Sequence, residues 1–168
     1  MKKAIFKLGS YPVRHWKDIA LAIVIFSGLT WWMQRDMLQD DALVVDYKLP
    51  SLLGDSHSIL DNQKTTLIYF FAPWCSICKL SMGNLSTVSS DIHTVAVALE
   101  YTNRSEVKDF IDGLGVNVPV LMGNSRVAND YKVNAFPSYY VIDNKGKVLE
   151  KSVGYSSIAG LLWRTNNS

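Results

Sequence analysis

Hydrophobic and polar positions divide this chain into two parts with different patterns. Residues 19–33 form one uncharged run without the polar face that a helix packed on a soluble core shows. From about residue 42 onward, short apolar and β-branched runs alternate with amphipathic segments, which predicts alternating strands and helices. We therefore expect an apolar N-terminal segment followed by a single α/β domain.

The order of the later segments predicts a mixed β-sheet with helices on both faces. Asn103 and Glu106 have the spacing of a capping box that begins a helix, and Gly115 suits the end of that helix. Residues 144–146 form a good hairpin turn between two strands. The expected strands are residues 66–71, 95–99, 118–121, 138–143 and 147–153, and the expected helices are residues 103–114, 125–131 and 156–164.

The uncharged run has the composition of a membrane anchor, and its flanks indicate an orientation. Its fifteen residues would span about 22 Å as a helix, against roughly 30 Å for a typical hydrocarbon core. Residues 1–35 carry a net charge of +5, whereas residues 36–168 carry −3. Because positively charged flanks remain in the cytoplasm, the later domain is expected outside it. Trp16, Trp31 and Trp32 would lie at the two membrane interfaces.

The run also has two alternatives to a membrane anchor. A cleaved signal peptide has an apolar region of similar length, but bulky Trp31, Trp32 and Met33 stand where small residues would mark a cleavage site. A buried soluble helix would need a polar face. An uncleaved anchor is favoured, and the expected organisation is a cytoplasmic basic segment at residues 1–18, a transmembrane anchor at 19–35, a linker at 36–41 and the folded domain at 42–168.

The only two cysteines, Cys75 and Cys78, have the spacing of a reversible dithiol. The strand at 66–71 and the break at Pro73 precede them, so Cys75 is expected at the N-terminus of a helix. There, unpaired backbone N–H groups and the helix dipole stabilise a thiolate. Cys78 would lie one turn later on the same face, and deeper. We predict that Cys75 attacks a partner protein's disulfide and that Cys78 resolves the mixed disulfide.

The cysteine pair has three alternatives to redox chemistry. A structural zinc site needs about four ligands, but there is no second cysteine pair and the three histidines, His15, His57 and His93, are far apart in sequence. A purely structural disulfide would close a very short loop and would constrain the unfolded chain little. Two inert buried cysteines are less consistent with the strand, break and helix around them. We expect no metal site.

Two segments resemble the active-site segments of the thioredoxin superfamily, and more narrowly of the membrane-anchored TlpA-like and ResA-like thioredoxins of bacterial envelopes. Residues 70–79 resemble the segment that carries the reactive cysteines. Residues 131–143 resemble the segment that carries the family's cis-proline, which makes Pro137 the candidate. Residues 46–54 resemble the short extra strand before the core. The resemblance implies a thioredoxin-like fold for residues 42–168.

The resemblance also implies the activity and the partners. It points to a thiol–disulfide oxidoreductase on the periplasmic side of a bacterial inner membrane, more in the role of a reductant than of an oxidant. Such a protein receives electrons through a membrane partner and reduces envelope proteins that bear cysteines or disulfides. It needs no cofactor besides its redox-active disulfide. The net charge of +2 gives no reason to expect nucleic acid as a partner.

Further site residues follow from the two matching segments. Trp74 would shield the thiolate and contact substrate, although plain core packing explains it equally well. Phe136 and Pro137 would present a backbone edge to an extended substrate segment, with core packing as the alternative for Phe136. Ser76 and Ile77 are expected to tune the reduction potential, which spans roughly −270 to −120 mV among such pairs.

The chain departs from the family pattern at the positions of two carboxylates. Tyr69 takes the place of the buried aspartate of thioredoxin, and Ser81 takes the place of a glutamate found in many TlpA-like proteins. The group that moves protons for Cys78 is therefore unassigned. Glu100 is a candidate substitute, although a helix-capping or solvent-facing role suits it better.

A second hypothesis comes from a different class of function. The same two thiolates would suit a periplasmic module that binds or delivers copper, because soft sulfur ligands select Cu(I). No cluster of methionines or histidines supports the pair in this role. The oxidoreductase is the leading hypothesis.

Overall fold

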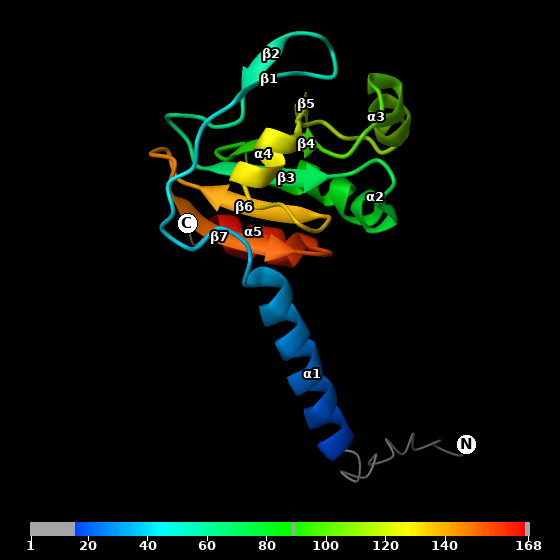
Figure 1. Cartoon of the computed structure of the whole chain (residues 1–168), viewed down its shortest axis with the longest axis vertical. Coiled ribbons are helices and arrows are strands. Elements are labelled where there is room, and N and C mark those ends of the chain that lie inside the picture. The colour runs from blue at the N-terminus through cyan, green and yellow to red at the C-terminus, as the bar shows by residue number, and fades with distance from the viewer. Residues whose placement is uncertain (1–15, 89, 167–168) are drawn as a thin grey trace, which may run out of the picture. The chain divides into compact units, whose positions relative to one another are not determined.

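The computed structural model describes residues 16–88 and 90–166, and the chain divides into two units at Trp32 and Met33. The described part of the first unit is residues 16–32, all within the helix α1, Trp16–Gln34 (Figure 1). Nothing in α1 is buried, and its length and composition are sufficient to cross a membrane. It begins three residues before the uncharged run, so its 19 residues span about 28 Å. The predicted basic segment 1–18 lies outside the described residues except for its last three.

The second unit is built on a five-stranded mixed sheet in the order β5-β4-β3-β6-β7. The central strand β3 runs parallel to β4 and antiparallel to β6, and β6 forms an antiparallel hairpin with β7. The strands are β3 Thr66–Phe71, β4 His93–Ala98, β5 Val120–Met122, β6 Ser138–Ile142 and β7 Val148–Val153. Every residue of β3 is buried, as its β-branched and aromatic composition predicts for a strand covered on both faces.

Helices cover both faces of the sheet, which confirms the predicted fold class. Val107 of α3 and Leu161 of α5 belong to one buried cluster together with Cys78 of α2. Val127 of α4 belongs to the cluster on the opposite face, and Figure 1 shows α4 in front of the sheet with α5 behind it. The helices are α2 Ser76–Met82, α3 Arg104–Ile111, α4 Ser125–Asp130 and α5 Ile158–Asn166, with a 3₁₀ turn η2 Gly83–Thr87 after α2.

A small antiparallel sheet precedes the core. It pairs β1 Lys48–Pro50 with β2 Ser56–Ser58, in the region expected to hold the extra strand. The chain before it is also packed on this unit. Met37 is buried in the cluster that contains Val127, and the amide of Asp41 donates to the carbonyl of Val148. Residues 36–41, expected as a linker, thus contact the sheet.

Helix α3 is shorter than the sequence predicts. The side chain of Asn103 accepts a hydrogen bond from the amide of Glu106 and caps the helix as expected, but the helix ends at Ile111 instead of near Leu114. Asp112 leaves the helical conformation with ψ 128°, and Gly113 follows at φ +83°. Gly113, which can adopt a positive φ, therefore ends the helix two residues before Gly115.

Candidate functional site

The two cysteines lie where the central strand passes into helix α2. After β3, the amide of Cys75 donates to the carbonyl of Ala72 and closes a turn. Cys75 is the N-cap of α2, and its Sγ accepts a hydrogen bond of 3.1 Å from the amide of Cys78. The predicted position of Cys75 at a helix N-terminus is therefore confirmed. The two residues form a disulfide with their Cα atoms 5.3 Å apart.

The two cysteines differ in their exposure to solvent. Cys75 is 6% exposed, whereas Cys78 is completely buried. Ser76 and Ile77 between them are exposed, as the outer face of the first helical turn requires. Of the two cysteines, only Cys75 has surface exposed to solvent, as the predicted order of attack requires; that order stays a prediction.

The loop before β6 lies beside the cysteines. In the antiparallel pairing of β6 with β3, Ser138 is opposite Phe70, so this loop reaches the end of β3 from which α2 departs. The peptide bond between Phe136 and Pro137 is cis, as the resemblance to the family implied for Pro137. Phe136 packs edge to face on Trp74 with 5.7 Å between the ring centroids. The two segments predicted to form the site are thus brought together.

The structure separates Trp74 from Phe136 with respect to the two roles considered for them, substrate contact and core packing. Trp74 contacts Phe136 yet keeps 62% of its surface exposed, so it is not a core residue. Phe136 is half-buried and packs against both core clusters. Phe136 therefore packs on the core and Trp74 lies on the surface beside it, and their contact with a substrate stays a prediction.

The buried hydroxyl groups of Tyr69 and Ser81 contact each other beneath helix α2. This contact was not predicted from the sequence. The hydroxyl of Tyr69 lies 3.1 Å from the carbonyl oxygen of Cys78 and 3.0 Å from the hydroxyl of Ser81. Burial raises the pKa of Tyr69 far above its ordinary value, so this side chain is a neutral phenol. The two positions at which the chain departs from its family thus face each other under Cys78.

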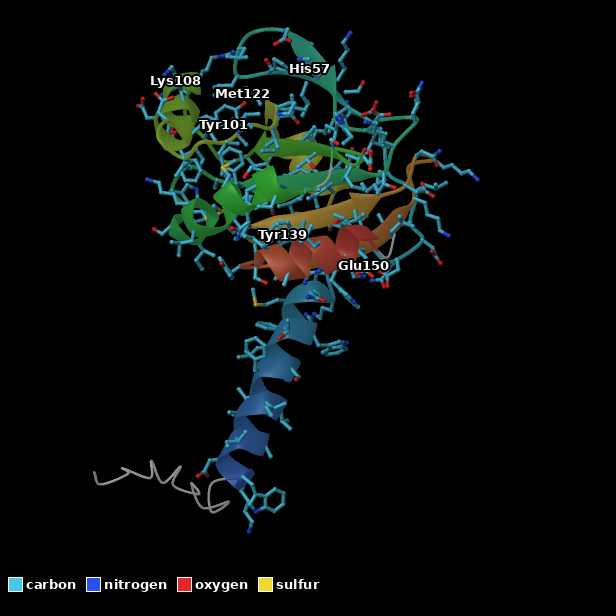
Figure 2. The ribbon with its side chains drawn as sticks, turned by 180° about the vertical axis from the view of Figure 1, so that it is seen from behind. His57, Tyr101, Lys108, Met122, Tyr139 and Glu150 are labelled. Carbon is cyan, nitrogen blue, oxygen red and sulfur yellow. A yellow bond between two sulfur atoms is a disulfide. The ribbon has the colours of Figure 1, made fainter. Side chains whose placement is uncertain are left out.

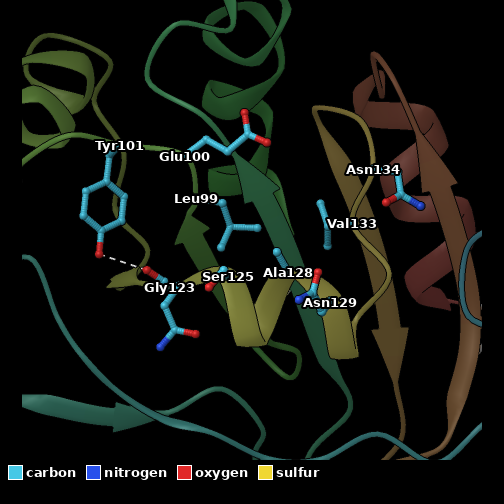
Figure 3. A pocket seen from close by; sticks show the side chains of 10 residues that line it. Leu99, Glu100, Tyr101, Gly123, Ser125, Ala128, Asn129, Val133 and Asn134 are labelled. Atoms are coloured by element: carbon cyan, nitrogen blue, oxygen red, sulfur yellow. Dashed lines mark hydrogen bonds between the residues drawn. The ribbon is translucent and has the colours of Figure 1, made fainter.

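An open pocket of about 630 Å³ lies at the carboxyl ends of β4 and β5 (Figure 3). Since β3 and β4 are parallel with Phe71 opposite Ala98, this pocket is on the same edge of the sheet as Cys75. The hydroxyl of Tyr101 donates to the carbonyl of Gly123 within it, at 2.9 Å. The lining consists of Leu99, Glu100, Tyr101, Gly123, Asn124, Ser125, Ala128, Asn129, Val133 and Asn134.

The structure also places two charged residues near the motif, Glu100 and Lys79. Glu100, considered as a proton acceptor, is exposed and lines the pocket (Figure 3). The ammonium of Lys79 lies 5.4 Å from the ring centroid of Phe110, a cation–π contact that accounts for its position. Across residues 16–88 and 90–166, His, Cys, Asp and Glu form no group of three that would hold a metal ion.

The sequence matches a family of known proteins. Residues 41–151 match the profile of the AhpC/TSA family. The chain is 28% identical over 148 residues to the thioredoxin-like protein YneN of Bacillus subtilis, with 80% of this chain and 87% of the relative covered. It is 27% identical over 135 residues to the thiol-disulfide oxidoreductase ResA of Geobacillus thermodenitrificans, with 77% and 76% covered.

The fold also matches solved structures. One is a thiol:disulfide interchange protein of the thioredoxin family from Chlorobium tepidum, with a TM-score of 0.67 and 20% sequence identity. The match covers 77% of this chain and 97% of that protein. At this level of identity the match demonstrates a thioredoxin-like fold.

Proposed function

The chain belongs to the AhpC/TSA family of thioredoxin-like proteins, and from this premise we propose that it is a membrane-anchored thiol–disulfide oxidoreductase that reduces envelope proteins. The observation that carries the proposal is the dithiol itself, in which a slightly exposed Cys75 caps a helix above a buried Cys78. Relatives named as thiol-disulfide oxidoreductases support the reaction class.

The proposed cycle consists of two thiol–disulfide exchanges. In the reduced protein, the Cys75 thiolate attacks one sulfur of a substrate disulfide, and the other substrate sulfur leaves as a thiolate. Cys78 then loses its proton and attacks the Sγ of Cys75. The Cys75–Cys78 disulfide forms as the second substrate sulfur leaves. The substrate gains two electrons and two protons, and a membrane partner's dithiol returns two electrons to the Cys75–Cys78 disulfide.

An apolar surface around Cys75 would receive the substrate. Trp74, Ile77 and Leu80 are all exposed, although large apolar side chains are usually buried. Phe136 adjoins Trp74, and the half-buried loop before Pro137 offers backbone groups next to it. An extended substrate segment that carries a cysteine would bury these side chains while its backbone pairs with the loop.

The two residues between the cysteines favour the reducing direction. Ser76 and Ile77 are exposed beside Cys75 and would affect the stability of its thiolate, hence the reduction potential. Their neutral side chains place no positive charge next to Cys75. A strong oxidant depends on unusual stabilisation of its reduced form, which these two residues do not supply. We therefore expect a reducing couple.

The proposed location follows from α1 and from the distribution of charge. An apolar helix with nothing buried, preceded by basic residues, would cross the inner membrane with its N-terminus in the cytoplasm. The catalytic domain would then lie in the periplasm. To test this, a reporter enzyme that is active only outside the cytoplasm is fused after Ser168 of the full chain. Reporter activity is expected, and an inactive but expressed fusion would reverse the orientation.

The activity is tested with the full chain purified in detergent and equilibrated with mixtures of reduced and oxidised glutathione. The fraction of Cys75–Cys78 disulfide, measured by alkylation of free thiols, should give a reduction potential below about −200 mV. A potential near about −120 mV would reverse the assigned direction. A chain that does not interconvert between dithiol and disulfide would overturn the activity itself.

Two variants test the roles of the cysteines in cells. Cys75→Ser should abolish reduction of substrate, because no sulfur accessible to the partner remains. Cys78→Ser should accumulate the mixed disulfide, since the resolving thiol is absent. The trapped partner is recovered on a non-reducing gel and identified. Trapping by Cys75→Ser in place of Cys78→Ser would contradict the assignment.

A further inference from the structure

The buried hydroxyls under helix α2 make more contacts than their hydrogens can satisfy. The hydroxyl of Tyr69 contacts the carbonyl of Cys78, and the hydroxyl of Ser81 contacts the carbonyl of Ile77 at 3.1 Å. Because a carbonyl oxygen only accepts, each hydroxyl donates its single hydrogen to its carbonyl partner. The 3.0 Å contact between Tyr69 and Ser81 then has no hydrogen. The two hydroxyl hydrogens of Tyr69 and Ser81 are thus shared among three contacts. Each O–H bond can rotate from its carbonyl toward the other hydroxyl.

A third hydroxyl lies beside this pair. The ring of Tyr139 contacts the ring of Tyr69 with 4.9 Å between their centroids, and Figure 2 labels Tyr139 on the side of the sheet that carries α5. Its hydroxyl is buried and makes no hydrogen bond in the part of the chain that the structure describes. Ser81 and Ser156 lie near enough to oppose the rise that burial causes in the pKa of Tyr139. Tyr139 thus adds a third buried O–H group beside the pair, one whose hydrogen is not used in a hydrogen bond with another described residue.

One of these hydroxyls, that of Tyr69, contacts the carbonyl of Cys78, the residue that must ionise in a buried position. Cys78 is completely buried, and its thiol must ionise before it can attack Cys75. A negative charge that develops in a buried site is costly unless nearby dipoles can turn toward it. Besides burial, the groups that shift the pKa of the Tyr69 phenol in the described structure are the hydroxyls of Tyr139 and Ser81, with no carboxylate among them.

We propose that Tyr69 is a positioning residue for the resolving step, and that the hydroxyls of Tyr69, Ser81 and Tyr139 reorient to stabilise Cys78 as it ionises. The hydrogen bond from Tyr69 also fixes the carbonyl of Cys78, and thereby the turn of α2 that presents its sulfur. This proposal rests on the proposed oxidoreductase activity and deepens it.

In the resolving step, bonds and protons balance without any proton being transferred to the three hydroxyls. The S–H bond of Cys78 breaks, the Cys75–Cys78 bond forms and the bond from Cys75 to the substrate sulfur breaks. The proton of Cys78 passes to solvent, and the substrate thiolate takes up one proton from solvent. Tyr69, Ser81 and Tyr139 keep their protons throughout and only change the direction of their O–H bonds.

The test separates the two chemical steps with 5,5′-dithiobis(2-nitrobenzoate) as the disulfide probe and the reduced full chain in detergent. Attack by Cys75 releases the first nitrothiobenzoate, and resolution by Cys78 releases the second. In Tyr69→Phe, the second release should slow about tenfold, as expected for the loss of one buried hydrogen bond. The first release should stay within about twofold of the parent rate. Ser81→Ala should also slow the second release and leave the first nearly unchanged. This variant tests the proposal if Tyr69→Phe does not fold.

Tyr140→Phe is the matched control. Tyr140 is a completely buried tyrosine of strand β6 whose hydroxyl donates to the carbonyl of Tyr131, in the cluster on the opposite face. Both releases should keep the parent rates in this variant. Equal slowing of both releases in Tyr69→Phe, or a Tyr69→Phe that matches Tyr140→Phe, overturns the proposal. A parent chain that does not show two releases would overturn the oxidoreductase activity instead.

Discussion

Trp74 and Phe136 lie edge to face with 5.7 Å between their ring centroids, and this contact joins the cysteine segment to the loop of Pro137. Aromatic pairs in this geometry stabilise by about 0.5–1.5 kcal/mol beyond the burial of area. Trp74 nevertheless remains largely exposed. The contact therefore fixes the orientation of an indole that still presents most of its surface to a partner.

Replacing Trp74 by alanine should weaken substrate binding more than chemistry. The variant loses apolar surface beside Cys75 but leaves Cys75 at the helix N-terminus, so we expect KM for a protein disulfide to rise about tenfold with kcat changed less than about threefold. The measurement is steady-state reduction of a protein disulfide. The control is Trp163→Ala on α5, whose side chain is 64% exposed against 62% for Trp74. An equal rise in KM in both variants would contradict this prediction.

Gly123 should not tolerate a side chain, whereas Gly83 should. A Cβ at Gly123 would lie 2.7 Å from Leu99 Cδ2 and 2.8 Å from Val97 Cγ1, below normal contact distance. Gly83 has a helical φ of −59° and open space around its missing Cβ. We expect Gly123→Ala to lower the free energy of unfolding by about 1–3 kcal/mol and Gly83→Ala to leave it unchanged or slightly raised. Chemical denaturation of both variants checks this, and equal stabilities would count against the packing described at Gly123.

Local patterns predicted the parts of the site that depend on neighbouring residues. The β-branched and aromatic run before Pro73 predicted the buried strand, and the break predicted that Cys75 would begin a helix. The segment around Pro137 was identified by resemblance, and its cis bond followed. The hairpin of β6 and β7 was evident from its turn residues.

Contacts between distant residues could not be predicted in this way. Tyr69 and Ser81 were recognised only as departures from a family pattern, because their contact depends on how α2 packs on β3. The burial of Met37 depends likewise on the packing of a segment with no regular pattern of its own. The early end of α3 reflects competition between Gly113 and Gly115, which sequence spacing does not resolve.

Phe110 should be a main source of stability for the face that carries the dithiol. Its ring stacks on Phe71 with 5.2 Å between centroids, and Lys79 covers it. Phe110→Ala removes both contacts and leaves a cavity, so the free energy of unfolding should fall by about 3–5 kcal/mol. Denaturation of the full chain in detergent measures this. Leu53→Ala, at a side chain that is 96% exposed, is the control and should change stability by less than about 0.5 kcal/mol.

Asp143 should make the stability of the β6–β7 hairpin depend on acid pH. Its Oδ1 accepts hydrogen bonds of 2.8 Å from the amides of Lys147 and Lys145, and the bond from Lys147 contributes most to lowering the pKa of this carboxyl. A carboxyl whose pKa is lower in the folded chain contributes stability that is fully present above its unfolded pKa of about 3.9. That contribution is lost as the pH falls through the folded pKa.

Asp143→Asn keeps an acceptor for the two amides but removes the titration. The parent should therefore be more stable than Asp143→Asn at pH 7, and the difference should shrink as the pH falls below about 4. Denaturation midpoints measured from pH 7 to about pH 3 give this difference directly. Asp109→Asn on α3 removes the same charge without these turn hydrogen bonds. A difference between parent and Asp143→Asn that stays constant with pH, or one that Asp109→Asn reproduces, would show that the turn carboxylate is not its source.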